Sequence, residues 1–257
     1  MSDVVWEVED RVAVVRLARP DKGNALSDRL VAELVTALRE ADGRSDVGAV
    51  VLEAEGRHFC AGGDLNDFLA AQAKPVEAGY EDIAPAMELF RLGFSLRTPV
   101  VAAVHGASRG GGVGLVALAH LAVADPGATF ALPEVSLGLF PFAIFPLLAR
   151  AMGPRRSLEL ALTGRTFGAE EALAYGLVQA VSEQAREQAR AWARTLAGRS
   201  PVAVRTGLEA YGRLTDPGAW PFDYLGLLRL VTFKSEALGA NVRRFLGGAR
   251  GGDGGEA

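Results

Sequence analysis

The stretch PVVAAVHGASRGGGVGLVALAHLAVADPGATFALPE, residues Pro99–Glu134, decides the fold of this chain. Its first part, Pro99–His105, is rich in valine and carries no acidic or basic charge, which is typical of a strand buried on both faces. Gly110–Gly112 follow and precede an apolar helical stretch, Val113–Ala119. Because glycines at the start of a helix leave backbone N–H groups accessible, this order predicts a site for an oxyanion or a phosphate.

The bulk composition narrows the class of protein. With 257 residues the chain can form one large α/β domain, or a domain with an appendage, around a sizeable core. A single cysteine, Cys60, excludes an internal disulfide and fits a reducing compartment. The net charge of −4 argues against a nucleic-acid surface. The N-terminus lacks a signal-peptide pattern and no apolar run is long enough for a membrane helix, so we expect a soluble, cytoplasmic protein that acts on small molecules.

The N-terminal third predicts the start of an α/β fold. Val4–Val8 and Val12–Leu17 alternate apolar and polar residues around a short charged turn, which indicates an antiparallel hairpin. Ser27 is a suitable N-cap for an amphipathic helix that extends to about Ala41. Gly48–Ala54 then forms a short buried strand. A strand, a helix and a strand in this order imply a right-handed parallel crossover.

A second glycine loop, FCAGGDL at Phe59–Leu65, repeats the order of the central stretch. Asp64 stands where the next helix begins, and we interpret it as a partner of the positive end of that helix rather than as a catalytic group. Residues 73–79, with Pro75, are expected to form a mobile surface loop before a helix over 79–97.

Beyond Glu134 the sequence becomes almost entirely helical. We expect a core over residues 1–198, a helical region over 199–247 and a disordered glycine-rich tail over 248–257. The expected helices in this part are Ile144–Met152, Arg156–Thr163, Ala169–Tyr175, Glu183–Ala197, Ser200–Leu214, Asp223–Glu236 and Ala240–Leu246.

Six segments in order make the chain resemble the crotonase superfamily, the enoyl-CoA hydratase/isomerase group: RPDKGNALS, FCAGGDL, TPVVAAVHG, GGGVGL, LPEVSLGL and TGRTFGAEEALAYGLV. The resemblance covers about Val4 to Val181. It implies a spiral of ββα units and a helical C-terminal region that packs between subunits in a homotrimer or a hexamer built from two trimers. The implied substrate is an acyl-CoA thioester, with CoA entering as part of the substrate and with no metal or separate cofactor.

The resemblance also implies the site residues. The backbone N–H groups of Gly63 and Gly111 would hold the thioester oxygen, and Glu134 would be the catalytic acid/base. Donors aimed at a developing enolate are commonly worth about 3–4 kcal/mol each. The apolar neighbours of Glu134 favour a pKa raised toward the operating pH. The remaining positions that match the substrate-binding segments are Ala25, Leu26, Ala61, Gly62, Asp64, Leu65, Gly110, Gly114 and Pro133.

One position departs from the two-glutamate hydratases. Gly114 stands where their second glutamate lies, and we expect substrate or water to fill the space. A single carboxylate favours transfer of one proton between two carbons, as in the conversion of a 3-enoyl-CoA to a 2-enoyl-CoA. The GGGVGL segment also resembles hydratases of branched or carboxylated enoyl-CoAs, which keeps hydration open. A non-catalytic acyl-CoA-binding subunit is a third interpretation.

Other interpretations compete for single segments. Residues 112–117, GVGLVA, match a dinucleotide-binding pattern, but an acidic residue at the required distance is not clearly present. The glycine cluster could also serve helix packing alone. Arg109 could pair with a substrate carboxylate, but we favour a surface acid as its partner. If Phe140, Phe142 and Phe145 line the acyl pocket, they favour a small or branched acyl group over a long chain.

Overall fold

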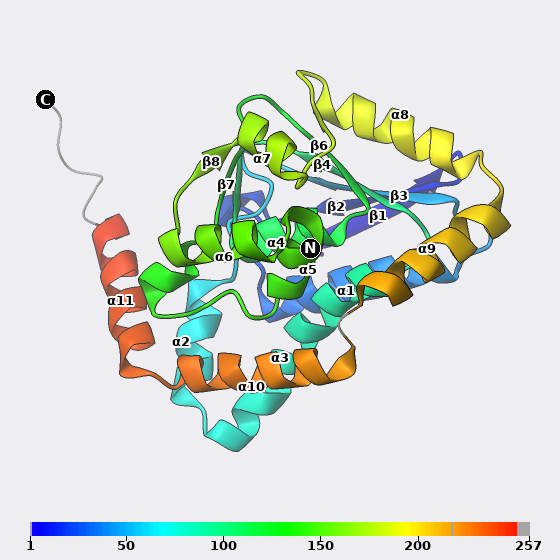
Figure 1. Ribbon diagram of the computed structural model, residues 1–257. Coiled ribbons are helices and arrows are strands. Elements are labelled where there is room, and N and C mark those ends of the chain that lie inside the picture. Colours follow the sequence, from blue (N-terminus) through cyan, green and yellow to red (C-terminus); the bar gives the residue numbers. More distant parts are fainter. Residues whose placement is uncertain (1, 217, 251–257) are drawn as a thin grey trace, which may run out of the picture.

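The computed structural model describes residues 2–216 and 218–250, and side chains outside 76–83, 219–222 and 248–250 (Figure 1). Its main sheet has the strand order β1-β2-β3-β4-β6-β9. β1 and β2 pair antiparallel, and all other neighbours in this sheet pair parallel. The strands are β1 (Val4–Glu9), β2 (Val12–Leu17), β3 (Ala49–Ala54), β4 (Val100–Val104), β6 (Leu121–Ala124) and β9 (Ala180–Val181).

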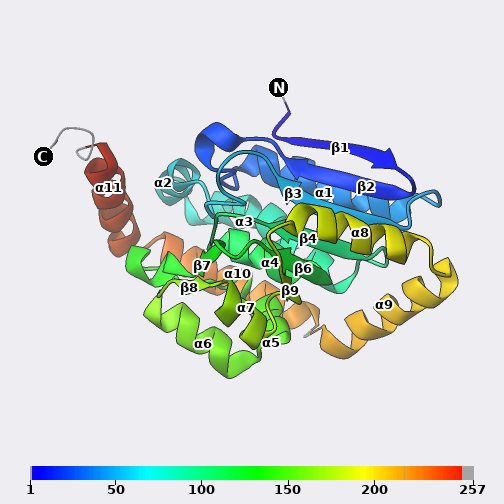
Figure 2. The same ribbon diagram turned by 90° about the horizontal axis from the view of Figure 1, so that it is seen from above.

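Helices cover both faces of this sheet, which explains why β3 and β4 are buried along their whole length (Figure 2). One face packs against α8 (Ala185–Ala197), whose buried alanines recur every four residues. The close approach requires Gly48, because a Cβ there would lie 2.7 Å from the Cα of Ala197. The larger core lies on the other face, under α1 (Asp28–Gly43), α3 (Val76–Arg91), α4 (Gly111–Leu118) and α5 (Phe145–Met152).

A small second sheet positions the central glycines. It has the order β5-β7-β8, with β5 (Ala107–Arg109), β7 (Thr129–Ala131) and β8 (Phe167–Gly168). β5 and β7 pair parallel with Arg109 opposite Ala131. The residues that follow each strand therefore leave the ladder side by side, and Gly110 is brought next to the segment that contains Glu134.

The C-terminal helices wrap around the outside of the core (Figure 1). A separate apolar cluster joins α2 (Leu65–Ala73), α10 (Ala219–Phe233) and α11 (Glu236–Arg250) to the segment after Glu134. Its buried members are Leu139, Phe233, Leu238 and Val242. The remaining elements are η1 (Pro20–Lys22), η2 (Leu92–Phe94), η3 (Pro133–Leu137), α6 (Pro154–Thr163), α7 (Ala169–Tyr175) and α9 (Pro201–Thr215).

The structure confirms the mixed α/β class with a helical C-terminal region, and the N-terminal hairpin, crossover helix and central strand. Ser27 caps α1 as expected, because its Oγ accepts a hydrogen bond from the Leu30 N–H at 3.3 Å. Among the described helices, none combines the length and the apolar character that a bilayer crossing requires.

Several expected boundaries are wrong. The expected loop over 73–79 is largely helical, since α3 begins at Val76 directly after Pro75. The expected helix over 223–236 is interrupted before Glu236, where the Ser235 Oγ accepts a hydrogen bond from the Leu238 N–H and starts α11. α4 begins at Gly111 rather than Val113. The tail expected over 248–257 lies mostly outside the described residues, and α11 extends to Arg250.

Candidate active site

The first glycine loop presents the N–H of Gly63. The Leu26 N–H donates to the Gly62 carbonyl at 2.7 Å, and the Asp64 N–H donates to the Leu26 carbonyl at 3.1 Å. These two hydrogen bonds fix the peptide groups on either side of Gly63. No backbone carbonyl among the described residues accepts a hydrogen bond from the Gly63 N–H. Gly62 has a φ of +95°, a left-handed conformation that glycine adopts without strain. The loop is therefore fixed with one donor left accessible.

The second loop presents the N–H of Gly111. Gly110, with a φ of +48°, donates its N–H to the Ala131 carbonyl at 2.9 Å and accepts a hydrogen bond from Gly114 at 3.1 Å. Gly111 is the first residue of α4, so its N–H has no acceptor within the helix, and none is recorded among the described residues. This N–H also lies at the positive end of the helix dipole.

Backbone hydrogen bonds join the two loops. The Cys60 N–H donates to the Ala107 carbonyl at 3.2 Å, and the Arg109 N–H donates to the Cys60 carbonyl at 2.9 Å. Gly112 allows this approach, because a Cβ there would lie 2.5 Å from the Cys60 carbonyl oxygen. The two accessible N–H groups, at Gly63 and Gly111, therefore come from adjacent segments.

Apolar side chains lie directly against both donor residues. A Cβ on Gly63 would lie 2.3 Å from Cζ of Phe68, and a Cβ on Gly111 would lie 2.6 Å from Cδ1 of Leu26. Only glycine fits at either position without displacing these side chains. Water-poor surroundings of this kind strengthen the electrostatic effect of the two donors on a bound oxyanion.

Glu134 lies beside the second loop. A Cβ on Gly110 would meet the Glu134 Oε1 at 2.6 Å and its Cδ at 3.2 Å, so the carboxyl group rests on the Gly110 Cα. The Glu134 Oε2 is buried and has no hydrogen-bond partner among the described residues. Burial raises the pKa of Glu134 to about 7, against lowering by its backbone hydrogen bond and by Arg229. A carboxyl group with this pKa can accept and return a proton near neutral pH.

The space beside Gly114 is filled by protein, so the expectation of substrate or water there is wrong. A Cβ on this buried glycine would lie 2.3 Å from Cγ2 of Ile144 and 2.8 Å from Cε1 of Phe90. No room remains for a longer side chain unless both neighbours move. A second carboxylate therefore has no space beside Gly114, and Glu134 is the acid whose buried oxygen lacks a partner among the described residues.

Two other expectations are corrected or refined. Among the described residues, Arg109 pairs neither with a surface acid nor with a site group. Its Nη1 instead donates to the carbonyls of Ser108 and Thr129 at 3.1 and 2.8 Å.

The phenylalanines after Glu134 contact one another. Phe140 contacts Phe142 and Phe145, with ring centroids 5.1 and 5.2 Å apart. Phe140 and Phe145 also pack on the main core, and it is Ile144 from this segment that reaches Gly114.

Asp64 has the structural role that the sequence indicates. It caps α2 by accepting a hydrogen bond from the Asn66 N–H at 3.0 Å, and it forms an ion pair with Arg19 at 2.9 Å. The remaining predicted positions lie in the same loops or at the ends of the adjoining helices: Ala25 is buried, Ala61 donates to the Gly23 carbonyl, Leu65 begins α2 and Pro133 begins η3.

Sequence reasoning missed Arg229, which lies on α10. Its Nη1 is buried without a hydrogen-bond partner among the described residues, and its guanidinium stands 5.0 Å over the ring of Phe233. Burial lowers the pKa of Arg229 to about 10, while Glu134 and Asp28 raise it. The available signal was a lone charge within the apolar run LGLLRLVTF, residues 225–233.

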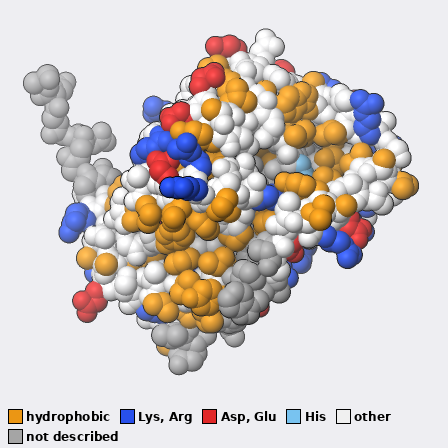
Figure 3. All heavy atoms as spheres, in the orientation of Figure 1, with side chains coloured by type: hydrophobic (Ala, Val, Ile, Leu, Met, Phe, Trp, Pro, Cys, Tyr) orange, Lys and Arg blue, Asp and Glu red, His pale blue; other side chains and the backbone are white. Residues whose placement is uncertain are grey.

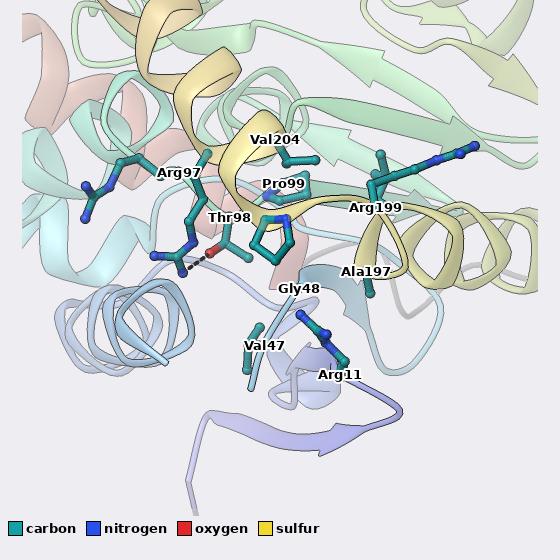
Figure 4. A pocket seen from close by; sticks show the side chains of 12 residues that line it. Arg11, Val47, Gly48, Arg97, Thr98, Pro99, Ala197, Arg199 and Val204 are labelled. Carbon is teal, nitrogen blue, oxygen red and sulfur yellow. Dashed lines mark hydrogen bonds between the residues drawn. The ribbon is translucent and has the colours of Figure 1, made fainter. Parts of the chain in front are cut away.

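A separate pocket lies at the end of the main sheet where the strands β3 and β4 begin (Figure 4). Gly48, Pro99 and Ala197 line it together with four arginines, and none of the predicted site residues does. The arginines do not converge: in Figure 4 the Arg97 and Arg199 side chains extend away from each other.

No group of His, Cys, Asp or Glu side chains within the described part of the chain could hold a metal ion.

The chain is similar to known proteins in sequence and in fold. Residues 7–218 match the model of the family described as enoyl-CoA hydratase/isomerase. A Bacillus subtilis (strain 168) protein named "Probable enoyl-CoA hydratase" is 34% identical over 261 residues, which cover 96% of each chain. A mevalonyl-coenzyme A hydratase of Beauveria bassiana is 37% identical over 81% of this chain and 79% of its own. The crystal structure of an enoyl-CoA hydratase/isomerase from Pseudoalteromonas atlantica T6c superposes with a TM-score of 0.85, at 26% identity, over 96% of this chain and 97% of that chain.

Proposed function

Since the chain belongs to the enoyl-CoA hydratase/isomerase family, we propose that it moves the double bond of a 3-enoyl-CoA to the 2-position, with Glu134 as the only acid/base. The observation that carries the proposal is the contact of the Glu134 carboxyl group with Gly110, directly beside the unengaged Gly111 N–H. A proton acceptor on η3 and an oxyanion donor at the start of α4 thus lie beside each other.

The reaction would proceed in two proton transfers. The Glu134 carboxylate removes a proton from C2 of the acyl chain, and the electrons move onto the thioester oxygen. The N–H groups of Gly63 and Gly111 donate to this enolate oxygen and lower its free energy. The enolate then collapses as C4 takes the proton back from Glu134, which leaves the double bond between C2 and C3. No water is consumed and the carboxylate is regenerated.

Isomerisation is favoured over hydration because of the environment of Gly114. Addition of water across a double bond benefits from one group that activates water and another that delivers a proton. Ile144 and Phe90 occupy the space in which a second carboxylate would stand. Hydration of a 2-enoyl-CoA remains the second candidate, since curated relatives carry the name enoyl-CoA hydratase.

The deciding experiment incubates the protein in deuterated water with crotonyl-CoA and, separately, with trans-3-hexenoyl-CoA. We expect the 3-hexenoyl thioester to become the conjugated 2-enoyl form, seen as a rise in enoyl thioester absorbance and as deuterium uptake by mass spectrometry. Crotonyl-CoA should remain unhydrated. Hydration of crotonyl-CoA would replace the isomerase proposal with the hydratase one. Affinity for both thioesters without turnover would favour a non-catalytic acyl-CoA-binding subunit.

We also infer that the C-terminal helices join copies of this chain into a trimer or a pair of trimers. Large apolar side chains on α9–α11 are unusually exposed: Val202 by 74%, Leu214 by 86%, Val231 by 69% and Phe245 by 61%. Figure 3 shows hydrophobic side chains gathered on the lower part of one face, over α10 and its neighbours. Sedimentation equilibrium would test this, since a monomer at micromolar concentration contradicts it.

A further inference from the structure

Arg229 is linked to the candidate active site by a chain of aromatic contacts. Its guanidinium lies 5.0 Å over the ring of Phe233, and Phe233 packs edge to face on Phe68 with 5.0 Å between ring centroids. Phe68 in turn covers Gly63, one of the two proposed oxyanion donors. Phe233 also packs in one cluster with Leu137 and Leu139, which follow Glu134 in the chain. The C-terminal end of α10 therefore reaches the acyl site.

The charge of Arg229 is not neutralised by an ion pair. Glu134 and Asp28 are the acidic groups that act on it electrostatically, and neither forms an ion pair with it among the described contacts. The Nη1 of Arg229 and the Oε2 of Glu134 are both buried and both lack a hydrogen-bond partner in the described part of the chain. The two opposite charges thus act on each other without an ion-pair contact among the described residues.

A guanidinium with a buried N–H group that lacks a hydrogen-bond partner is costly to retain. Leaving a charged group buried and unpaired typically costs several kcal/mol, so folded proteins pair such groups or use them to bind a ligand. Glu53 follows the first rule, because it pairs with Arg16 and Arg190. Arg229 fits the second, because its Nη1 has no partner among the described residues and its contacts through Phe233 and Phe68 connect it to the Gly63 loop.

We propose that Arg229 binds a carboxylate on the acyl chain, so that the preferred substrate is an enoyl-CoA whose acyl group ends in a second, free carboxylate. This inference rests on the proposed acyl-CoA function and names its substrate class. The planar guanidinium matches a carboxylate with two parallel N–H···O bonds. One buried cation suits one carboxylate, whereas the phosphates of CoA carry several charges and remain strongly hydrated. Arg229 also lies beyond residues 7–218, which match the family.

The test compares two substrates that differ only at the far end of the acyl chain: trans-3-hexenoyl-CoA and the mono-CoA thioester of trans-3-hexenedioic acid. We expect the wild-type protein to have a kcat/KM at least tenfold higher for the carboxylated substrate. Arg229→Met should lower that value by about 10²-fold and change the value for 3-hexenoyl-CoA by less than about threefold. Arg229→Lys should restore part of the preference. Arg213→Met, on the exposed surface of α9, is the matched control and should change neither value.

The wild-type comparison alone decides the inference if Arg229→Met does not fold. Equal kcat/KM values for the two substrates, or a preference for 3-hexenoyl-CoA, would overturn it. An equal loss on both substrates in Arg229→Met would also overturn it, because Arg229 would then act through Glu134 rather than on the substrate. If neither substrate turns over, the proposed function fails, and calorimetric binding of adipoyl-CoA and hexanoyl-CoA decides instead. Tighter binding of adipoyl-CoA that Arg229→Met abolishes supports the inference, and equal binding contradicts it.

Discussion

Glu53 is a buried carboxylate and Glu134 has a buried carboxyl oxygen, and their surroundings give them opposite properties. The Glu53 side chain is 0% exposed and accepts hydrogen bonds from Arg16 at 2.8 Å and from Arg190 at 2.9 Å. These arginines hold the pKa of Glu53 below its usual value despite the burial. Glu134 has a buried oxygen without a partner, and its pKa rises to about 7.

The difference shows that burial alone does not determine the chemistry of an acid. Glu53 lies in the middle of the sheet, where β2 supplies Arg16 and α8 supplies Arg190. Its negative charge is fixed at neutral pH, so it stabilises the fold and is a poor proton acceptor. Glu134 follows the end of a strand, where the effect of burial on its pKa exceeds the opposing effects of its backbone hydrogen bond and of Arg229. The same functional group is structural in one place and suited to proton transfer in the other.

The largest expected effect comes from removal of the unpaired acid. Glu134→Gln should lower kcat by about 10²–10⁴-fold, because a positioned acid/base contributes this much to proton transfer. The affinity for hexanoyl-CoA should stay within a few-fold, since the backbone donors remain. Stopped-flow absorbance with 3-hexenoyl-CoA and calorimetry measure the two quantities. Turnover that survives Glu134→Gln would remove the contrast between the two acids.

The paired acid should show the converse behaviour. Glu53→Gln should lower the free energy of unfolding by roughly 2–4 kcal/mol, because two guanidinium groups lose a buried anion while staying partly hydrated. Turnover per folded molecule should change less than about twofold. Urea unfolding followed by circular dichroism gives the stability. A large loss of turnover at unchanged stability would show that Glu53 also serves the reaction.

The apolar surrounding of Glu134 can be tested at Gly114. Gly114→Ala should lower the free energy of unfolding by about 1–3 kcal/mol, because its Cβ overlaps Ile144 and Phe90. Gly207→Ala on α9 is the control, since nothing lies within 4 Å of the added Cβ. The control should be neutral or slightly stabilising. Equal stability of the two variants would mean that space exists beside Gly114 after all.

The smallest expected effect is the change in kcat/KM and in stability for each unit of pH as Glu134 and Glu53 titrate. Catalysis needs the Glu134 carboxylate, so kcat/KM should fall about tenfold for each pH unit below about 7. Stability should move the other way: the folded protein holds this proton above the ordinary value of 4.5, so the contribution of Glu134 is full below 4.5 and is lost as pH rises through about 7. The contribution of Glu53 is lost on acidification, because its pKa is lowered.

Urea unfolding of the wild type, Glu134→Gln and Glu53→Gln between pH 4 and 8 measures the opposite pH dependences of the two stability contributions. Relative to Glu134→Gln, the wild type should lose about 1.4 kcal/mol per pH unit as the pH rises within the titration range. Relative to Glu53→Gln, it should lose stability as the pH falls. Parallel pH curves for the two pairs would contradict the comparison.

The sequence predicts the parts of the site that depend on local order along the chain. Strand ends followed by glycines predict the loops at Gly63 and Gly111, and the position of Glu134 follows from the segment resemblance. The parallel pairing of β5 with β7 brings the Gly111 loop beside Glu134, and the hydrogen bonds of Cys60 with Ala107 and Arg109 bring the Gly63 loop beside the Gly111 loop. Oxyanion donation and proton transfer by these residues remain proposals that the experiments above address.

The parts that sequence analysis missed depend on packing between distant segments. Gly114 shows that an acid is absent, but not that Phe90 and Ile144 close the space. Glu53 is a charge within an apolar strand, and its role appears only when β2 and α8 bring arginines to it. Arg229 is likewise an isolated charge whose neighbours come from other parts of the chain.

The pairing of β5 with β7 has a mechanical consequence. The loop that carries Gly110 and Gly111 and the loop that carries Glu134 extend from one hydrogen-bonded ladder, so the two would shift together as a rigid body. Arg229 stands on α10, outside that ladder. A displacement of α10 would therefore change which acyl chain is accepted while the spacing between proton acceptor and oxyanion donor stays the same. The ladder would set the spacing of the reacting groups, and α10 would set which acyl chain is accepted.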